Sequence, residues 1–392
     1  MTTLRLALIK GPVYDPFYQR LDLFSRATGI ETEVVWHLPW HELLETLQTN
    51  YANPQPEVPI DLVTSHSKYA PSMHHFLQPL DDLLTRQEIA RFSPAAIDFA
   101  RIDGLLYALP RNFDVRVLVY RTDILTASQL PPTWVELIGT AVRLADVPHD
   151  RSGFVFTGKM SGLFGSFYEL LASAGGQLLD GEFRPAFVSS EGEWALGTLR
   201  RLYQDAATAE MADYSYDEVA FAFRDGRCAM YMEWPGFWSL ITDPGTSKVL
   251  GRIGVALYPL GPTGRKVYAG SHTFAITTSA RDLPASVELL RFLTSDESLL
   301  TEARVGSLVP KPSVLKTVMG EAAPDSIEAI RWQALQTTME NYSLLPPKME
   351  RWPVVEDTLW PALRQGYTGE LDIHNALERA AEAITAALAV RA

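Results

Sequence analysis

The sequence predicts an α/β protein with two lobes. Short apolar runs rich in β-branched residues alternate with longer segments of helical periodicity, which is the pattern of α/β units around parallel sheets. The chain has 392 residues, of which 47% are hydrophobic. Because a single hydrophobic core stops growing at roughly 250 to 300 residues, a chain of this length is expected to divide in two.

The first α/β unit is the clearest. Residues 4–9 predict a strand, and Asp15 followed by Pro16 predicts a helix start, with proline at the first helical position. Gly29 predicts the end of that helix, because glycine readily adopts the left-handed conformation that closes helices. Residues 30–36 then predict a second strand.

Three polar side chains lie where predicted strands end. Tyr14 follows the first strand, and Ser65 and His66 follow a third strand predicted over 60–64. The carboxyl ends of parallel strands line the crevice where such folds bind ligands. We therefore expect Tyr14, Ser65 and His66 to line a binding crevice.

Residues 111–120 predict an extended segment that crosses between the lobes. Asp114 and Arg116 are two positions apart, so on a strand they would face the same side. There they could together bind the vicinal hydroxyls of a ligand. The alternative is an ion pair, either between the two or at the surface.

The second lobe is expected to be mostly helical. Three S/T-x-x-E capping boxes predict helix starts: Thr133 with Glu136, Ser190 with Glu193, and Ser215 with Glu218. An Ala-rich amphipathic helix is predicted over 373–390.

Aromatic residues crowd a loop after the strand predicted just beyond Gly226. Sugar rings stack their apolar faces on indoles, so Trp234 is a candidate ligand contact. A position in the core is an equal alternative for Trp234 and the favoured one for Trp238.

Small residues gather at a second loop, where Gly270 and Ser271 would let backbone N–H groups approach a ligand and His272 could contact it. An ordinary turn before a strand is the alternative.

Catalytic, cofactor and metal motifs are not found in the sequence. It has no G-x-S-x-G elbow, P-loop, H-E-x-x-H or dinucleotide-binding glycine pattern in a plausible context. His37 and His41 have the spacing of a metal pair, but Pro39 between them would break the helix. The neighbouring Asp81 and Asp82 are better explained as helix caps than as a glycosidase pair. We therefore predict no catalytic residue, no cofactor and no metal.

The net charge of −13 disfavours nucleic acid and anionic membranes as partners. The apolar runs are shorter than the ~20 residues that span a bilayer. Cys228 is the only cysteine, so no intramolecular disulfide is expected. The chain opens on Met1-Thr-Thr without the features of a signal peptide. It is therefore expected to be either cytosolic or a form from which a signal was removed.

Several short phrases lie in order along nearly the whole chain, at 24–34 (FSRATGIETEV), 61–63, 77–82, 103–110, 118–123, 132–137 (PTWVEL), 223–230, 309–315 and 369–377. In this order they resemble the family 1 extracellular solute-binding proteins of bacterial ABC importers, which include sugar-binding proteins. One departure is Arg121, which stands where the family usually has Asn; another is the missing secretion signal.

This resemblance implies a periplasmic-binding-protein fold, in which two α/β lobes are joined by a multi-strand hinge with the ligand cleft between them. The N-terminal lobe would comprise 1–115 plus 268–313, and the C-terminal lobe 116–267 plus 314–392. It adds Lys311 and Tyr168 to the ligand-binding candidates. The implied function is capture of a small solute by hinge closure, most often a mono- or disaccharide, and its delivery to membrane permease subunits.

By the same resemblance the protein would be a monomer, not an enzyme, and would act in the periplasm or anchored outside the cytoplasmic membrane. Two alternatives stay open. One is a carbohydrate-active enzyme that uses the same cleft. The other is a sensor of the same fold, whose ligand could be a sugar acid, a sulfonated sugar or a polyol, since Arg116, His272 and Lys311 could serve an anion.

Overall fold

The computed structural model describes residues 2–389. Internal contacts group the chain into two compact units, each of which is described by itself. Unit 1 comprises Met1–Asp114, Gly270–Ala322 and Pro347–Trp352, and unit 2 comprises Val115–Ala269, Ala323–Pro346 and Pro353–Ala392. The lobe boundaries and the hinge expected from the sequence stay predictions.

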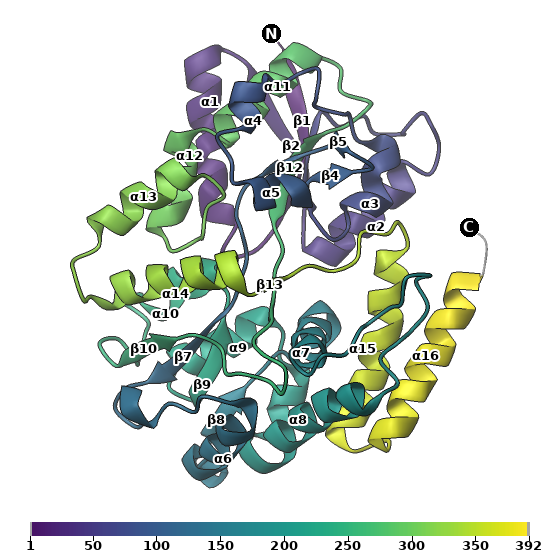
Figure 1. Cartoon of the computed structure of the whole chain (residues 1–392). Coiled ribbons are helices and arrows are strands. Elements are labelled where there is room, and N and C mark those ends of the chain that lie inside the picture. The colour runs from purple at the N-terminus through teal and green to yellow at the C-terminus, as the bar shows by residue number, and fades with distance from the viewer. Residues whose placement is uncertain (1, 390–392) are drawn as a thin grey trace. The chain divides into compact units, whose positions relative to one another are not determined.

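Unit 1 is built on a five-stranded sheet in the order β2-β1-β3-β12-β6 (Figure 1). The strands β1, β2 and β3 run parallel, whereas β12 and β6 are antiparallel to their neighbours. The sheet is therefore only partly parallel, which differs from the expected parallel sheet. The strands are β1 (Thr3–Ile9), β2 (Glu31–Leu38), β3 (Leu62–His66), β6 (Leu109–Pro110) and β12 (His272–Ile276), with a small hairpin of β4 (Arg101–Ile102) and β5 (Leu105–Leu106).

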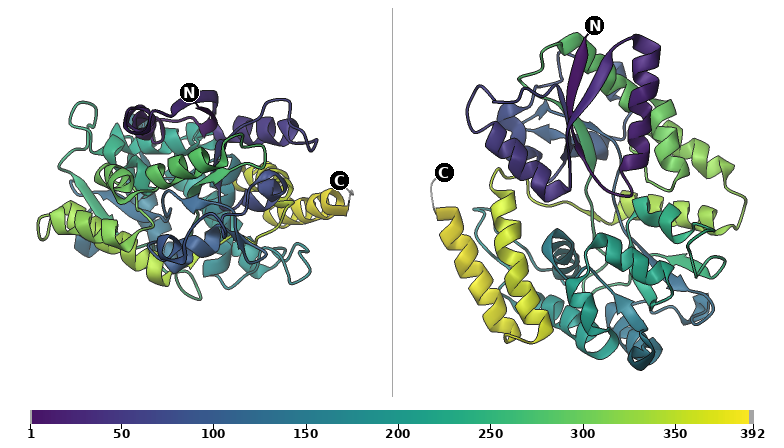
Figure 2. Two further views of the ribbon diagram at one scale, coloured as in Figure 1. Left: turned by 90° about the horizontal axis from the view of Figure 1, so that it is seen from above. Right: turned by 180° about the vertical axis from the view of Figure 1, so that it is seen from behind.

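Helices flank this sheet, and Figure 2 shows α1 and α2 beside β1 and β2. The predicted helix start at Asp15 is a 3₁₀ turn, Asp15–Gln19, that leads into α1, and Gly29 closes α1 with φ of 74° as expected. The helices of unit 1 are α1 (Arg20–Thr28), α2 (Trp40–Asn50), α3 (Ala70–Met73), α4 (Arg86–Ile89), α5 (Pro94–Phe99), α11 (Leu283–Leu293), α12 (Asp296–Arg304) and α13 (Pro312–Glu321).

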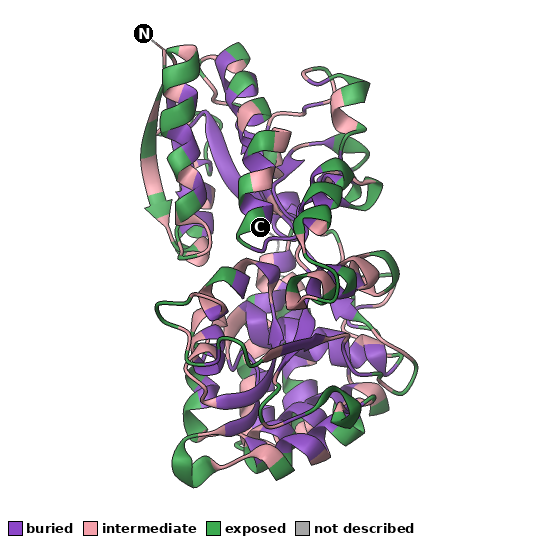
Figure 3. Ribbon diagram, turned by 90° about the vertical axis from the view of Figure 1, so that its left-hand side faces the viewer, coloured by how far each residue is buried: buried purple, intermediate pink, exposed green. Residues whose placement is uncertain are grey.

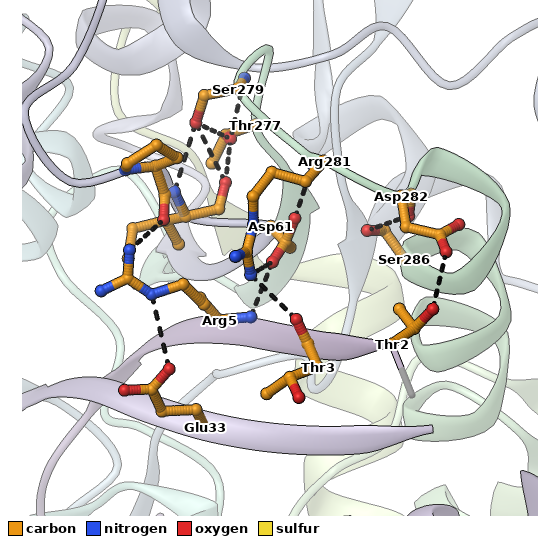
Figure 4. Close-up of polar contacts among 12 residues, drawn as sticks. Thr2, Thr3, Arg5, Glu33, Asp61, Thr277, Ser279, Arg281, Asp282 and Ser286 are labelled. Atoms are coloured by element: carbon orange, nitrogen blue, oxygen red, sulfur yellow. Dashed lines mark hydrogen bonds and ion pairs between the residues drawn. The ribbon is translucent and has the colours of Figure 1, made fainter. Parts of the chain in front are cut away.

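A buried carboxylate fastens the amino end of β3 (Figure 4). Asp61 accepts hydrogen bonds from the backbone N–H groups of Arg5 and Arg281, both at 2.7 Å, and from the Arg281 guanidinium at 2.9 Å. Several donors offset the cost of burying the charge. Asp61 thereby ties β1, β3 and the segment after β12 together, at the end of β3 opposite His66.

Unit 2 contains a mixed four-stranded sheet in the order β10-β7-β9-β8. Only β8 and β9 are parallel, and a separate parallel pair joins β11 to β13. The predicted strand after Gly226 is confirmed as β9, while the segment predicted to be extended from residue 111 becomes a strand only at Val117. The strands are β7 (Val117–Arg121), β8 (Ser152–Val155), β9 (Cys228–Glu233), β10 (Ile253–Ala256), β11 (Val267–Tyr268) and β13 (Ser343–Leu344).

Helices make up most of the rest of unit 2. The capping boxes at Thr133 and Ser215 are confirmed, but α8 is capped by Ser189, which accepts from the N–H of Gly192, instead of by Ser190. The helices are α6 (Trp134–Leu144), α7 (Met160–Ser173), α8 (Ser190–Ala206), α9 (Tyr216–Arg224), α10 (Trp238–Ile241), α14 (Ile327–Asn341), α15 (Trp352–Thr368) and α16 (Ile373–Ala389). Val390, where the last helix was predicted to end, lies outside the described residues.

Each unit has its own apolar core, and Figure 3 shows that the sheet strands of unit 2 are buried along most of their length. In unit 1, Leu6, Leu62 and Phe274 are fully buried, and in unit 2 Val119 and Met230 are. Within 2–389, each helix is too short or too polar to cross a membrane.

Candidate functional site

Strand register brings two predicted residues together in unit 1. His272 of β12 lies directly opposite His66 of β3, so both side chains project from the same face of the sheet. Their rings meet edge to face with centroids 4.8 Å apart. Both side chains are partly exposed, whereas the neighbouring pair, Ser65 and Thr273, is buried.

Tyr14 packs against His272. Its hydroxyl is hydrogen bonded to Nε2 of His272 at 2.9 Å, and the two rings pack edge to face at 4.8 Å. Nδ1 of His66 accepts the backbone N–H of Lys68 at 3.2 Å. Burial lowers the pKa of His66, and burial, aided by Arg111 and Lys68, lowers that of His272 to about 3. Both rings are therefore neutral at physiological pH.

A carboxylate and an amide complete this group. Asn112 accepts the backbone N–H of His272 at 2.7 Å and donates to both carboxylate oxygens of Asp114, each at 3.0 Å. The nearer oxygen of Asp114 lies 3.9 Å from Nε2 of His272, and 14% of the Asp114 side chain is exposed. We call Tyr14, His66, Asn112, Asp114 and His272 the histidine group. It presents neutral and acidic polar atoms on one surface.

Trp40 borders the histidine group and was not predicted. Its indole stacks on Tyr69 at 5.3 Å with an interplanar angle of 20°, and it lies 6.4 Å from the ring of His66. Trp40 is partly exposed, whereas Tyr69 is buried. The residue opens α2, directly after the second strand, so its position at a strand end is a signal that could have identified it.

Three of the predicted small or polar residues have structural roles. Ser65 is fully buried and donates to the sulfur of Met73, while the Ser271 hydroxyl donates to the carbonyl of Asn112 at 2.7 Å. The backbone N–H of Gly270 donates to the carbonyl of Asp114. A Cβ at Gly270 would lie only 2.7 Å from the His66 ring. Gly270 therefore makes room for His66, and its N–H does not reach out to a ligand as we had expected.

Lys311 does not join the histidine group. It is 3% exposed, its ammonium donates to Asp296 at 3.0 Å, and it lies 4.7 Å from the centre of the Phe92 ring. The role predicted from the resemblance is therefore not supported by its position. Its neighbours explain it as the link between α12 and the start of α13.

Arg116 belongs to unit 2 and is not paired with Asp114. It is 2% exposed, its guanidinium lies 2.6 Å from a carboxylate oxygen of Glu169, and it donates to the Ser166 hydroxyl at 3.4 Å. The expectation that Asp114 and Arg116 face the same side of one strand is wrong, because β7 begins only after both residues.

Trp234 is a partly exposed aromatic residue of unit 2. The Arg116 guanidinium lies 4.9 Å from its ring centre, and Tyr268 meets it edge to face at 6.0 Å. Tyr258 lies on Arg116 at 5.9 Å. We call Arg116, Glu169, Trp234, Tyr258 and Tyr268 the tryptophan group. Trp238, by contrast, is buried as predicted.

Tyr168 is buried beside the tryptophan group. Its hydroxyl donates to the carbonyl of Leu345 at 2.8 Å, and its ring stacks on Phe164 at 5.5 Å. Burial raises the pKa of this phenol above its ordinary value. With its hydroxyl engaged by the backbone, Tyr168 supports α7 instead of presenting a polar atom to a ligand.

A second buried ion pair holds the chain next to Trp234. Arg331 donates to Glu233 at 3.1 Å and to the carbonyl of Pro235 at 2.9 Å, and its guanidinium lies 4.5 Å from the ring centre of Trp238. Burial raises the pKa of Glu233 to about 7, although Arg331 opposes the shift. This pair fixes both ends of the turn that carries Trp234.

Among residues 2–389, no three His, Cys, Asp or Glu side chains are arranged to hold a metal ion. Cys228 is buried in β9, and burial raises the pKa of its thiol.

The sequence is similar to those of known proteins. Residues 10–299 match the model of the family described as bacterial extracellular solute-binding protein. A "Probable ABC transporter-binding protein" of Deinococcus radiodurans is 27% identical over 61% of this chain and 59% of its own length. The "Mannitol-binding protein" of Pseudomonas aeruginosa is 26% identical over 69% of this chain and 65% of its own length. The chain thus matches less than two thirds of the length of these curated relatives.

Solved structures share the fold. A maltose-bound MalE3 of T. maritima superposes with a TM-score of 0.87 and 24% identity, covering 98% of this chain and 99% of the other. A solute-binding protein of an ABC transporter from Agrobacterium radiobacter K84, in complex with ribitol, superposes with a TM-score of 0.85 and 23% identity, covering 98% of each chain. The α/β fold expected from the resemblance is confirmed. With the family model matching most of its length, the chain belongs to the bacterial extracellular solute-binding protein family.

Proposed function

We propose that the protein is the substrate-binding component of an ABC importer and that it captures a small neutral sugar or polyol. The histidine group of unit 1 and Trp234 of the tryptophan group in unit 2 are each proposed as ligand contacts. The observation that carries the proposal is the combination, in a chain of this family, of partly exposed aromatic rings with polar groups, among which the buried cation Arg116 is paired with Glu169. Aromatic faces stack on the C–H faces of sugars, and fixed polar atoms receive the hydroxyls.

The charges in and around the two groups favour a neutral solute over an anionic one. Arg116 is paired with Glu169, and Lys311 with Asp296. The low pKa of His272 keeps this ring uncharged. The alternatives of a sugar acid or a sulfonated sugar therefore have less support than a sugar or polyol. Named relatives include a mannitol-binding and a galactooligosaccharide-binding protein.

A thermal-shift screen followed by calorimetry tests the ligand class. The probes are D-mannitol, ribitol, D-tagatose and maltose, with D-gluconate and D-glucuronate as matched anions. A ligand at ~100 times its dissociation constant should add about 2.7 kcal/mol to the free energy of unfolding. Stabilisation by a neutral probe supports the proposal, and stabilisation by the anions alone contradicts it.

Variants of the two groups test the site. Asp114→Ala and Trp234→Ala should each weaken binding of the probe found in the screen while leaving the far-UV circular dichroism unchanged, because both side chains are partly exposed. Lys311→Met is the control, since its ammonium is engaged by Asp296. Unchanged calorimetric affinity in both test variants would remove Asp114 and Trp234 from the site.

We further infer that the protein releases its solute unaltered, works outside the cytoplasmic membrane as a monomer, and delivers the solute to permease subunits. The family membership and the names of the relatives support these roles. Hinge closure stays a prediction from the resemblance. A carbohydrate-active enzyme would instead convert its sugar, so recovery of an intact probe after hours with the protein, measured by chromatography, distinguishes the two. Transport by a vesicle that contains the permease distinguishes an importer component from a sensor.

A further inference from the structure

We propose that Glu169 and Arg116 are positioning residues that hold the indole of Trp234 in one orientation. The inference rests on the proposed function, because Trp234 is taken as a ligand contact. It assigns Arg116 a role different from ligand binding: its guanidinium acts on the solute only through the ring that it supports.

The first step is the contact between Arg116 and Trp234. The guanidinium carbon lies 4.9 Å from the centre of the indole ring and 5.9 Å from the centre of the Tyr258 ring. A planar guanidinium can lie along an aromatic face and is attracted by its quadrupole, more strongly where both are desolvated. Arg116 is 2% exposed, so it supports Trp234 from the buried side.

The second step is that Glu169 binds both Arg116 and Tyr268, which lie beside Trp234. One carboxylate oxygen lies 2.6 Å from the Arg116 guanidinium, and the other accepts the backbone N–H of Tyr268 at 3.2 Å. Tyr268 in turn meets the indole edge to face at 6.0 Å. One side chain of α7 therefore fixes the two groups between which the indole is held.

Close packing leaves Tyr268 little room to move. A Cβ at Gly165, one turn before Glu169 on α7, would lie 2.9 Å from the Tyr268 ring. The absence of a side chain at Gly165 lets β11 approach α7 closely enough for the hydrogen bond from Tyr268 to Glu169. The contact is therefore built into the packing of α7 against β11.

The indole needs this support because its own polar atom does not anchor it. Within the described chain, Nε1 of Trp234 has no hydrogen-bond partner. The backbone on either side is held, since Arg331 binds Glu233 and the carbonyl of Pro235. Backbone anchoring leaves the side-chain torsions free, so the ring contacts decide the orientation of the indole: those with Arg116 and Tyr268, and an edge-to-face contact with Tyr216 at 6.2 Å.

The substitution Arg116→Lys separates the ion pair with Glu169 from the packing of the guanidinium on the Trp234 ring. Lysine keeps the positive charge beside Glu169 but loses the planar group that packs on the ring. Arg111→Lys is the matched control: Arg111 is also buried, pairs with Glu302 at 2.8 Å and packs on aromatic rings, but it belongs to unit 1. Glu169→Gln, which is nearly isosteric, tests the same contact if Arg116→Lys fails to fold.

The measurement is fluorine NMR of ligand-free protein labelled with 5-fluorotryptophan. The chain has nine tryptophans, and the line of Trp234 is assigned by its loss in Trp234→Phe. In Arg116→Lys this line should shift and broaden, and its solvent-induced shift between H₂O and D₂O should grow. The lines of Trp238 and Trp332 should stay, and Arg111→Lys should leave the Trp234 line in place.

An unchanged Trp234 line in a folded Arg116→Lys or Glu169→Gln variant would overturn the inference, as would equal shifts of the Trp238 and Trp332 lines. Because the experiment uses no ligand, its outcome is separate from that of the proposed function. Failure of every sugar probe to bind would count against the proposed function alone. A Trp234 line that does not change in Arg116→Lys would count against the positioning role of Arg116 and Glu169 alone.

Discussion

Replacing Glu233 with Gln should remove a pH dependence from the stability of the protein. Glu233 is fully buried at the end of β9 and is bound by Arg331, which also holds the turn of Trp234. Burial raises the pKa of its carboxyl from an ordinary 4.5 to about 7, against the opposing effect of Arg331. Gln keeps the size of the side chain and an oxygen that can accept from Arg331, but it cannot take up the proton.

The sign follows from proton binding. Between pH 4.5 and 7 the folded state holds this proton and the unfolded state does not, so stability falls as the pH rises. Each tenfold difference in proton affinity is worth about 1.4 kcal/mol. The contribution of Glu233 is therefore fully present below pH 4.5, is lost as the pH rises through 7, and amounts to about 3 kcal/mol.

Urea unfolding of both proteins at pH 5 and pH 7.5 measures this contribution. The free energy of unfolding of the wild type, minus that of Glu233→Gln, should decrease by about 2 to 3 kcal/mol between the two pH values. The subtraction cancels the other titrating groups. Glu340→Gln, an exposed carboxyl at the end of α14, is the control and should show no such decrease. Equal pH slopes for the wild type and Glu233→Gln would refute the burial argument.

Three further predictions concern the other predicted site residues. The pKa of His272 is lowered to about 3, so its contribution to stability is present above pH 6.5 and is lost as the pH falls through 3. On acidification, the free energy of unfolding measured in urea should therefore fall by up to about 5 kcal/mol less in His272→Gln than in the wild type. Gly270→Ala should push the His66 ring aside and lower the calorimetric affinity for the ligand several-fold, and an unchanged affinity would argue against His66 as a contact. Lys311→Met should cost about 1 kcal/mol of stability through its lost pair with Asp296 and leave the affinity unchanged.

Local signals predicted much of the fold. Gly29, the capping boxes at Thr133 and Ser215, and strand β9 are where the sequence placed them, because each depends on neighbouring residues alone. The direction of the strands in the sheets could not be predicted in this way. The antiparallel direction of β12 against β3 depends on the return of the chain from residue 269, and periodicity does not encode it.

The site could be predicted where a side chain follows a strand and not where it depends on a distant partner. Tyr14 and His66, which follow the first and third strands, are partly exposed, and each contacts His272 at the start of β12; their role in ligand binding stays a prediction. Arg116 and Lys311 were misjudged because their carboxylate partners lie on other elements, Glu169 on α7 and Asp296 on α12, and local sequence patterns do not encode such pairs. One signal was present: Glu169 is the sole charged residue of α7, Met160–Ser173, and a lone acid in a buried helix requires a partner.

These pairings bear on how the protein could select a solute. A buried cation that is already neutralised offers a ligand little electrostatic attraction, yet removing it would leave a buried carboxylate unpaired. Arg116 is neutralised by Glu169, so its proposed contribution to the site is to orient the Trp234 ring and not to attract the solute. Under the proposed function, discrimination among solutes would depend in unit 1 on the shape of the Trp40 surface and the hydrogen bonds of Asp114, and in unit 2 on the shape of the Trp234 surface. Such a site separates sugars and polyols by their hydroxyl arrangement more sharply than by one added methylene, because a missing hydroxyl leaves a polar group unpaired.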